Sequence, residues 1–369
     1  MGCPFMGLNL FGGTEDYGPG ASIGALGKKL GRPSLFKFYS FGMPMVAVRG
    51  KDKIQKAIYK REFGHGVTSF DYNKLPNLME IFGARSVLYE SNKDKHSMLR
   101  RLIGVAMNPK ALEQAVDPIQ KASQSQVEKI VASLGSEVAM DEICNDLTLD
   151  IAWRQILGLD LSTEEEIEEF HKATKEWVEV ISADLSLLMP FRLPWLKRNR
   201  GYKARQYLVD QVEKKIAQLD RDGRDGSTLS EIYFATDEDG TTKLSHQEVL
   251  DNSLILILAG SETSASTLTN VMLLLGLHKD KLKKLQQEQR EYIAKHGTTL
   301  VKDEIDADMT YLDALLRETL RIRPLPTTEV RVAETSMVMD GQQIPKKWAV
   351  LANIRATHEM DPACRKNDN

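Results

Sequence analysis

Cysteine is scarce in this sequence, and the three that occur lie far apart, at Cys3, Cys144 and Cys364. An odd number of cysteines without paired spacing argues against a disulfide framework and against a structural zinc site. Free cysteines at this low frequency are typical of a protein in a reducing compartment. We therefore expect no disulfide bonds, and we expect the hydrophobic core to stabilise the fold.

An excess of positive charge is also absent. Lys and Arg together number 49, against 52 Asp and Glu, which gives a net charge of −3. A main partner made of nucleic acid is therefore not expected. The chain has 369 residues, 42% hydrophobic and 27% charged, a composition typical of a globular protein with one large domain or two.

Long apolar runs are missing as well. The runs at 254–258 and 271–275 are far shorter than the roughly 20 residues that cross a bilayer, so no membrane-spanning helix is expected. The N-terminus shows neither a signal peptide nor an anchor helix. Gly2 suggests N-myristoylation, but Met6 stands where that pattern needs Ser or Thr. As given, the chain is expected to be soluble.

The clearest element is a long helix from Ser245 to His278. Ser245 and Glu248 have the spacing of a capping box, which predicts the helix start. Apolar residues surround the helix near both ends, a pattern typical of burial inside a large domain. A polar segment, Ala259-Gly260-Ser261-Glu262-Thr263-Ser264, interrupts it at the midpoint.

Two interpretations of this polar segment are open from the residues alone. In the first, Glu262 faces water, and the Ser and Thr hydroxyls bond back to helix carbonyls. In the second, Gly260 lets a ligand approach the helix, and Glu262 and Thr263 handle protons beside it. Composition by itself favours the first interpretation.

The segment 259–264 resembles the A/G-G-x-D/E-T-T/S signature in the long central helix of cytochromes P450. A second motif follows at the family's separation, because Glu318-Thr319-Leu320-Arg321 matches E-x-x-R, with Pro324 and Pro326 after it. Either motif alone is weak, since i,i+3 charge pairs are common on exposed helices. The two in this order indicate the family, and the resemblance spans residues 2–362. His96, the strand at Trp348 and the region 190–205 resemble the retinoid- and sterol-oxidising branches.

The resemblance implies a mainly α fold with a small β region, incomplete at the C-terminus. We expect a single P450-like domain over 1–369. Within it, 1–60 and 327–362 contribute the small β region, and 90–322 form the helical core. Alternation at 328–332, an Asp340-Gly341 turn and a strand at 348–354 support the β assignment.

The resemblance also implies roles for several residues beside a haem. Thr263 and Glu262 would be catalytic, and Ala259 and Gly260 would line the cofactor. His96 and Arg100, four apart on a basic helix over 92–107, and Arg331 on a strand would meet haem propionates. From the residues alone, a solvated basic residue is the more usual interpretation of each. Arg101 competes with Arg100, and Glu318 and Arg321 would be structural.

The iron ligand is the main departure from the family. Its cysteine belongs to an F-x-x-G-x-x-x-C-x-G loop, and no such loop is present before Asn369. Cys364 has neither the Phe nor the Gly of that loop. We therefore expect no metal ligand in this chain, which resembles a C-terminally truncated P450, inactive as given. His358 has no paired ligand nearby.

Three functions remain open. The first is a haem-thiolate monooxygenase, complete only in a longer form, which hydroxylates an apolar retinoid-, sterol- or terpenoid-like substrate with O₂. Its electrons would come from a reductase or ferredoxin, and it would lie at the endoplasmic reticulum or plastid membrane. The apolar, proline-broken Leu187–Leu196 would touch that membrane peripherally. The second is a haem-less relic that binds an apolar ligand, and the third an unrelated helical scaffold.

Overall fold

The computed structural model describes residues 13–14, 18–19, 21–40, 43–55, 67–69, 76–182, 197–237 and 240–360. The chain folds into two compact units. Unit 1 comprises 1–75, 181–188 and 320–369, and unit 2 comprises 76–180 and 189–319. Leu187–Leu196, Cys3 and Cys364 lie outside the described residues.

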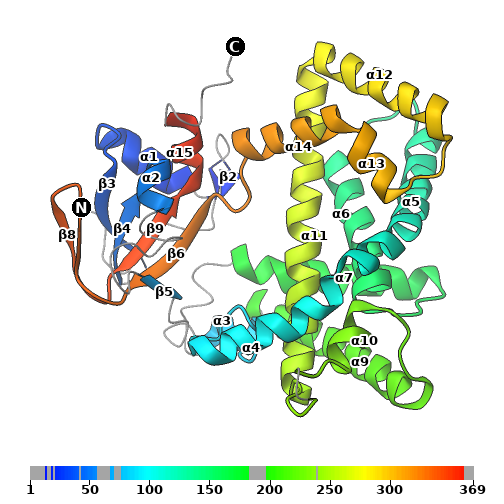
Figure 1. Cartoon of the computed structure of the whole chain (residues 1–369), viewed down its shortest axis with the longest axis horizontal. Coiled ribbons are helices and arrows are strands. Elements are labelled where there is room, and N and C mark those ends of the chain that lie inside the picture. Colours follow the sequence, from blue (N-terminus) through cyan, green and yellow to red (C-terminus); the bar gives the residue numbers. More distant parts are fainter. Residues whose placement is uncertain are drawn as a thin grey trace. The chain divides into compact units, whose positions relative to one another are not determined.

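Unit 1 holds a mixed five-stranded sheet in the order β3-β4-β9-β6-β5 (Figure 1). The central pair, β4 and β9, runs parallel, and the other pairs are antiparallel. The strands are β3 (Leu35–Ser40), β4 (Met43–Val48), β5 (Val67–Ser69), β6 (Thr328–Ala333) and β9 (Ala349–Asn353). The expectation of a small β region in a mainly helical protein is thus confirmed.

Both faces of this sheet are buried, because successive side chains of β4 and β9 point to opposite faces and are apolar on both. Val46 and Val350 pack on one face together with the hairpin residue Met337. Met45 and Leu351 pack on the other face with Ile23 of α1 (Ala21–Lys29). A strand buried on both sides reads as a continuous apolar run, which is what residues 349–352 show.

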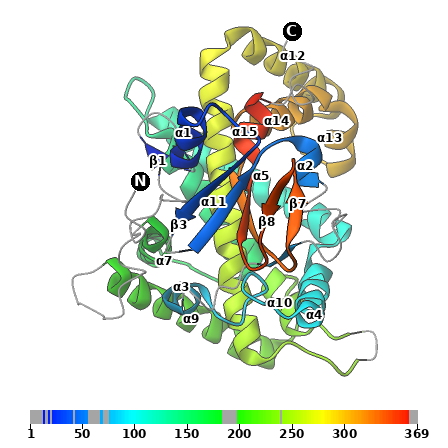
Figure 2. The same cartoon turned by 90° about the vertical axis from the view of Figure 1, so that its left-hand side faces the viewer.

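A separate hairpin joins β7 (Met337–Met339) to β8 (Gln342–Ile344), and Figure 2 shows it beside β3 and β4. Asp340 and Gly341 form its turn with φ of 49° and 72°. Positive φ at both turn residues is the type I′ geometry that Asp-Gly favours, so the predicted hairpin is confirmed. The remaining helices of unit 1 are α2 (Lys51–Ile54) and α15 (Ile354–Met360).

Unit 2 is built around α11 (His246–Leu277), the longest helix among the described residues (Figure 1). Ser245 caps it, and the reciprocal bonds with Glu248 form the predicted capping box. Its other helices are α3 (Pro76–Phe82), α4 (Lys93–Gly104), α5 (Pro109–Ala132), α6 (Met140–Ile151), α7 (Glu164–Val178), α9 (Lys197–Asp222), α10 (Thr228–Tyr233), α12 (Lys279–His296), α13 (Lys302–Asp308) and α14 (Thr310–Ile322). Helix α14 extends across the boundary at 319–320 into unit 1.

The helices of unit 2 pack where their apolar faces meet. Helix α6 lies along α11, and α7 lies along α9. Trp177 of α7 is fully buried, and its indole N–H donates to the carbonyl of Ile81 at 2.8 Å. A buried indole needs such an acceptor, so this bond joins α7 to α3.

Two stretches whose Gly or Asp content is typical of loops contain regular structure. The stretch 221–242 holds helix α10, which Ser227 caps through a bond from the Ser230 N–H. The stretch 63–88 holds β5 and α3. Asp and Gly enrichment concealed the short apolar helix in the first stretch, and glycines concealed α3 in the second.

Candidate functional site

The midpoint of α11 presents the predicted segment on an exposed face. Ala259, Gly260 and Thr263 are exposed, whereas Ser261 and Ala265 are 1% exposed. Residues 259, 260 and 263 share one side of the helix because three to four residues make a turn. The structure therefore brings three of the predicted site residues together on one surface of small side chains.

The Thr263 hydroxyl donates a hydrogen bond to a carbonyl of its own helix. Its Oγ1 donates to the carbonyl of Ala259 at 2.6 Å, and Thr267 donates in turn to the carbonyl of Thr263 at 2.7 Å. Ser261 bonds back to Ile257 in the same way. The back-bonding interpretation therefore describes the hydroxyls correctly. A Thr hydroxyl that donates still has lone pairs, so Thr263 keeps the capacity to accept a hydrogen bond.

Glu262 does not share the exposed face, because it is half-buried. Burial raises the pKa of its carboxyl group, and the charge of Lys175 on α7 opposes that rise. Desolvation disfavours the charged carboxylate, so Glu262 holds its proton to higher pH than an exposed glutamate does. A retained proton is a property that a proton donor needs.

Because Gly260 has no side chain, nothing projects from the helix surface at this position. A Cβ added there would lie 3.4 Å from Cδ1 of Ile156 and within 4 Å of no other neighbouring atom. An alanine would fit without a clash, so packing against unit 2 does not require glycine here. The absence of a side chain matters only for what approaches the exposed face.

A polar network, which no sequence motif indicated, anchors the first half of α11. Asp251 is 2% exposed and accepts from Arg205 Nη2 at 2.6 Å and from the Arg85 N–H at 2.9 Å. Asn252 Oδ1 accepts from the Val87 N–H at 2.8 Å. These bonds hold the 83–87 loop against the helix. Polar residues at 251–253 beside the apolar run 254–258 were the one signal of this network in the sequence.

The two basic candidates of α4 lie on one helix but differ in surroundings. Asn92 caps α4 by accepting from the N–H groups of Asp94 and Lys95, as the predicted helix over 92–107 requires. His96 is half-buried and Arg100 is exposed, and neither side chain makes a hydrogen bond or ion pair with any described residue. The neighbouring Lys95 instead binds Glu248 of α11 at 2.8 Å.

Arg101 and Arg331 each lie near a carboxylate of the protein. The charge of Arg101 helps to lower the pKa of Asp237, after hydrogen bonds from Thr242 and Thr241. Arg331 of β6 pairs with Glu329 two residues earlier on the strand, and its Nη1 donates to the Val330 carbonyl at 3.0 Å. A carboxylate ligand would have to compete with Glu329 for Arg331.

Glu318 and Arg321 are three residues apart on α14, as their motif requires. Glu318 is exposed and Arg321 is half-buried. Nδ1 of His358 lies 3.0 Å from the Arg321 carbonyl, so the imidazole packs beside the end of α14 in unit 1. No group of three or more His, Cys, Asp or Glu side chains suited to a metal ion occurs among the described residues.

Haem needs a flat face and, in the family that the motifs resemble, a thiolate ligand. Ala259, Gly260 and Thr263 fit the first requirement because they form an exposed surface of small side chains. Cys144, the one cysteine in the described ranges, does not fit the second: it is 4% exposed within α6. The described part of the chain therefore fits the ring and supplies no accessible sulfur.

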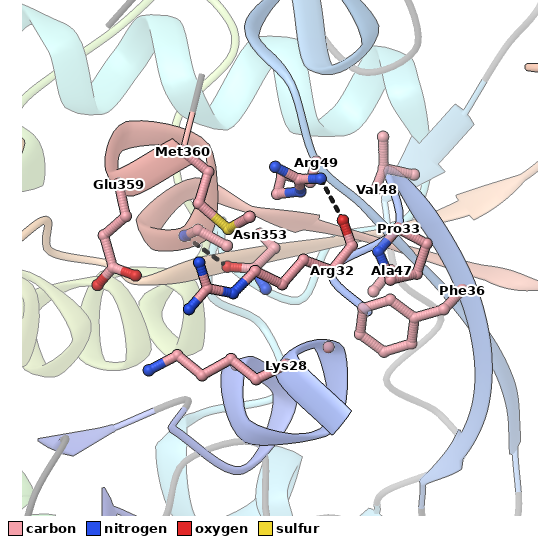
Figure 3. Close-up of a pocket in the computed structure, with 13 residues that line it drawn as sticks. Lys28, Arg32, Pro33, Phe36, Ala47, Val48, Arg49, Asn353, Glu359 and Met360 are labelled. Carbon is pink, nitrogen blue, oxygen red and sulfur yellow. Dashed lines mark hydrogen bonds between the residues drawn. The ribbon is translucent and has the colours of Figure 1, made fainter. Parts of the chain in front are cut away.

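Unit 1 has a small pocket of its own, shown in Figure 3. Lys28, Arg32 and Glu359 stand around it, and Arg49 donates through Nη2 to the Arg32 carbonyl at 2.5 Å. Its volume is about 30 Å³. That is room for a water molecule or two, far below the size of organic ligand pockets, so it is no substrate site.

The long helix, with Ala259, Gly260 and Thr263 on its exposed face, and the small mixed sheet define the class of a mainly helical protein with a small β region. A family model described as "Cytochrome P450" matches residues 2–364, so the chain belongs to the cytochrome P450 family. The resemblance inferred from the two motifs is thereby confirmed.

The chain is similar to curated proteins named cytochrome P450 26B1. It is 26% identical over 332 residues to cytochrome P450 26B1 of Danio rerio, across 88% of this chain and 62% of that protein. It is 27% identical over 341 residues to cytochrome P450 26B1 of Xenopus tropicalis, across 91% of this chain and 64% of that one. The chain thus spans less than two thirds of the length of these curated relatives.

Solved structures confirm the fold. The structure titled retinoic acid bound cyanobacterial CYP120A1 superposes with a TM-score of 0.80 at 22% identity, over 99% of this chain and 78% of that one. The cytochrome P450DA heme domain superposes with a TM-score of 0.78 at 17% identity, over 93% and 74%. At these identities the likeness concerns the fold alone.

Proposed function

We propose that this chain is part of a haem-thiolate monooxygenase that hydroxylates an apolar, retinoid-, sterol- or terpenoid-like substrate with O₂. The observation that carries the proposal is the exposed face of Ala259, Gly260 and Thr263 on the central helix. Family membership supports it, as do relatives named cytochrome P450 26B1 and a similar fold solved with retinoic acid bound.

The chemistry divides between cofactor and protein. Haem, when bound, supplies the activation of O₂. Gly260 leaves space at the helix surface, and Thr263 accepts a hydrogen bond through the lone pairs that its bond to Ala259 leaves available. Glu262 holds a proton because burial raises the pKa of its carboxyl group, and it releases that proton through water.

The basic residues have a separate role in the proposal. His96 and Arg100 bind carboxylates of the cofactor, which is consistent with side chains that bind no described residue. Arg331 also binds a cofactor carboxylate, which replaces Glu329 as its partner. Glu318 and Arg321 are structural residues of α14 and take no part in the reaction.

Residues 1–369 by themselves do not assemble the thiolate-ligated centre in this proposal. Cys144 is buried within α6, and an iron ligand must reach the exposed face of α11. Among the described residues, the chain therefore offers no accessible sulfur to the iron. A haem-less protein that binds an apolar ligand is the alternative for the chain as given, and the same burial of Cys144 favours it.

Partners follow from the proposed reaction. Each turnover needs electrons from a reductase or a ferredoxin. A net charge of −3 disfavours nucleic acid, and Leu187–Leu196 is proposed as a peripheral contact with the endoplasmic reticulum or a plastid membrane. In the described ranges, no helix is both long and apolar enough to cross a bilayer.

The experiment is Thr263→Ala in a haem-binding form of the protein. The variant should keep its haem spectrum but divert electrons from product to hydrogen peroxide, because the acceptor at the helix surface is lost. Thr263→Ser, which keeps the hydroxyl, is the matched control. Unchanged coupling of reductant to product in Thr263→Ala would refute the assigned role.

A further inference from the structure

A second concave region of unit 2 lies away from the face of α11. It is an open groove of about 520 Å³ between α5 and the end of α6. Pro118, Ala122 and Leu159 give it an apolar lining, and charged side chains stand at its edges. Organic ligands occupy pockets of roughly this size, about 300–1,000 Å³.

Each of the two carboxylates in the groove has a cationic partner on the protein. Asp117 pairs with Lys121 one helical turn away at 2.8 Å. Asp150 lies 3.2 Å from His171 Nε2, and it accepts from Trp153 Nε1 and Gln126 Nε2, each at 3.2 Å. Burial lowers the pKa of His171, but its contacts with Asp146 and Asp150 outweigh burial and raise it. The imidazolium that these contacts favour balances Asp150.

Arg154 is the charge in the groove that no described residue balances. Its side chain is exposed and makes no ion pair or hydrogen bond with a described residue. Its guanidinium stacks on the Trp153 ring at 3.9 Å from the centroid, and Trp153 is 1% exposed. This cation–π contact holds the guanidinium over the ring, and no described residue occupies its N–H donors.

The backbone beneath Arg154 is unusual. Ala152–Ile156 form a π-helical turn, closed by the Leu157 N–H on the Ala152 carbonyl at 3.2 Å. Such turns are rare and concentrate at functional sites, because the extra residue redirects side chains. Here Arg154 lines the groove, while Ile156 lies at Gly260 of α11.

We propose that this groove binds an amphipathic organic anion. Arg154 holds the acidic group, since its fork of donors matches a carboxylate. Pro118, Ala122 and Leu159 contact the apolar body. The site is distinct from the face of Ala259, Gly260 and Thr263, and it does not depend on the function proposed for that face.

The test is a titration of the 369-residue chain with octanoate, followed by isothermal titration calorimetry. Octan-1-ol and octylamine are the neutral and cationic probes with the same apolar body. Arg154→Gln removes the charge, and Arg154→Lys keeps the charge but removes the fork. Arg290→Gln is the matched control, because Arg290 is an exposed arginine of α12. Thermal melts of each variant check that it is folded.

Octanoate should bind the unaltered chain more tightly than either other probe. Arg154→Gln should weaken octanoate binding by about tenfold, because one charged hydrogen-bonding group is lost. The octanoate affinity of Arg154→Lys should lie between those of the unaltered chain and Arg154→Gln. Arg290→Gln should bind octanoate like the unaltered chain. The proposal is overturned if octanoate does not bind, if octan-1-ol binds equally well, or if folded Arg154→Gln binds octanoate like the unaltered chain.

Discussion

Arg205 of α9 and Asp251 of α11 form an ion pair of 2.6 Å in which Asp251 is 2% exposed. Gln247 and the Arg85 N–H donate to the same carboxylate. A buried carboxylate with three partners fixes the α9, α11 and 83–87 segments around one point. The exposed face of α11 begins about two turns further along that fixed helix.

Breaking this pair should destabilise the protein strongly. We expect Arg205→Met to lower the free energy of unfolding by about 3–5 kcal/mol, because it leaves a buried carboxylate without its counter-charge. Urea denaturation followed by circular dichroism measures the change. The control is Asp313→Ala, which removes the exposed pair with Arg317 and should cost about 0–1 kcal/mol. Equal losses in the two variants would contradict the assignment.

Gly83 should tolerate no side chain, because its φ is +91° and an added Cβ would lie 2.6 Å from Cβ of Asp251. Gly223 has a similar φ of +83° but open space around it. Gly223→Ala should therefore cost about 1–2 kcal/mol from backbone strain alone, and Gly83→Ala clearly more. Denaturation midpoints of the two variants provide the comparison. A smaller loss of stability in Gly83→Ala than in Gly223→Ala would contradict the close packing of Gly83 against Asp251.

His171 should make stability depend on pH. Its contacts with Asp146 and Asp150 raise its pKa against the effect of burial, so its contribution is complete below the ordinary histidine pKa of about 6.5. That contribution is lost as the pH rises through the raised pKa of the folded state. The stability difference between the unaltered chain and His171→Gln should thus shrink as the pH rises from about 6.5 through the raised pKa of His171.

The carboxylates of this cluster give the opposite trend. His171 and Lys175 lower the pKa of Asp146, so its contribution is present above the ordinary Asp pKa and is lost as the pH falls through the lowered value. Denaturation of Asp146→Asn across acidic pH separates the two trends.

For His171, a stability difference between the unaltered chain and His171→Gln that stayed constant or grew with rising pH would show that the imidazolium does not stabilise the fold.

Glu318 and Arg321 are proposed to be structural. In a haem-binding form of the protein, Glu318→Ala should prevent accumulation of folded holoprotein. Expression level and the haem absorbance of purified protein measure this. Asp313→Ala, on the same helix, is the matched control and should leave both readings unchanged. Normal yield and haem content in Glu318→Ala would reject a structural role.

Local patterns predicted local structure well. Ser245 and Glu248 marked the start of α11, and Asp340-Gly341 marked the hairpin turn, because each acts through bonds within a few residues. The parallel pairing of β4 with β9 joins Met45 to Ala349, and no short-range pattern encodes such a contact. The same limit concealed the anchors from Asp251 to the 83–87 loop and to α9.

The candidate site was predictable only in part. The exposed face of Ala259, Gly260 and Thr263 follows from helix geometry and the family motif. The half-burial of Glu262 depends on how neighbouring elements pack around α11, and the engagement of Arg331 depends on a carboxylate of the same strand. The π-helical turn at 152–156 also lies beyond sequence periodicity, because it adds one residue to an otherwise regular pattern.

The most direct measurement is a carbon monoxide difference spectrum of residues 1–369 after addition of haem and reduction. Cys144 is buried within α6, and Cys364 lacks the Phe and Gly of the family's ligand loop, so the account predicts no Soret band of the thiolate-ligated type. Cys364→Ser and Cys144→Ser identify the sulfur if such a band appears. Any thiolate-type band would contradict the account, because the chain would then supply its own iron ligand, and a band that survives both variants would implicate Cys3.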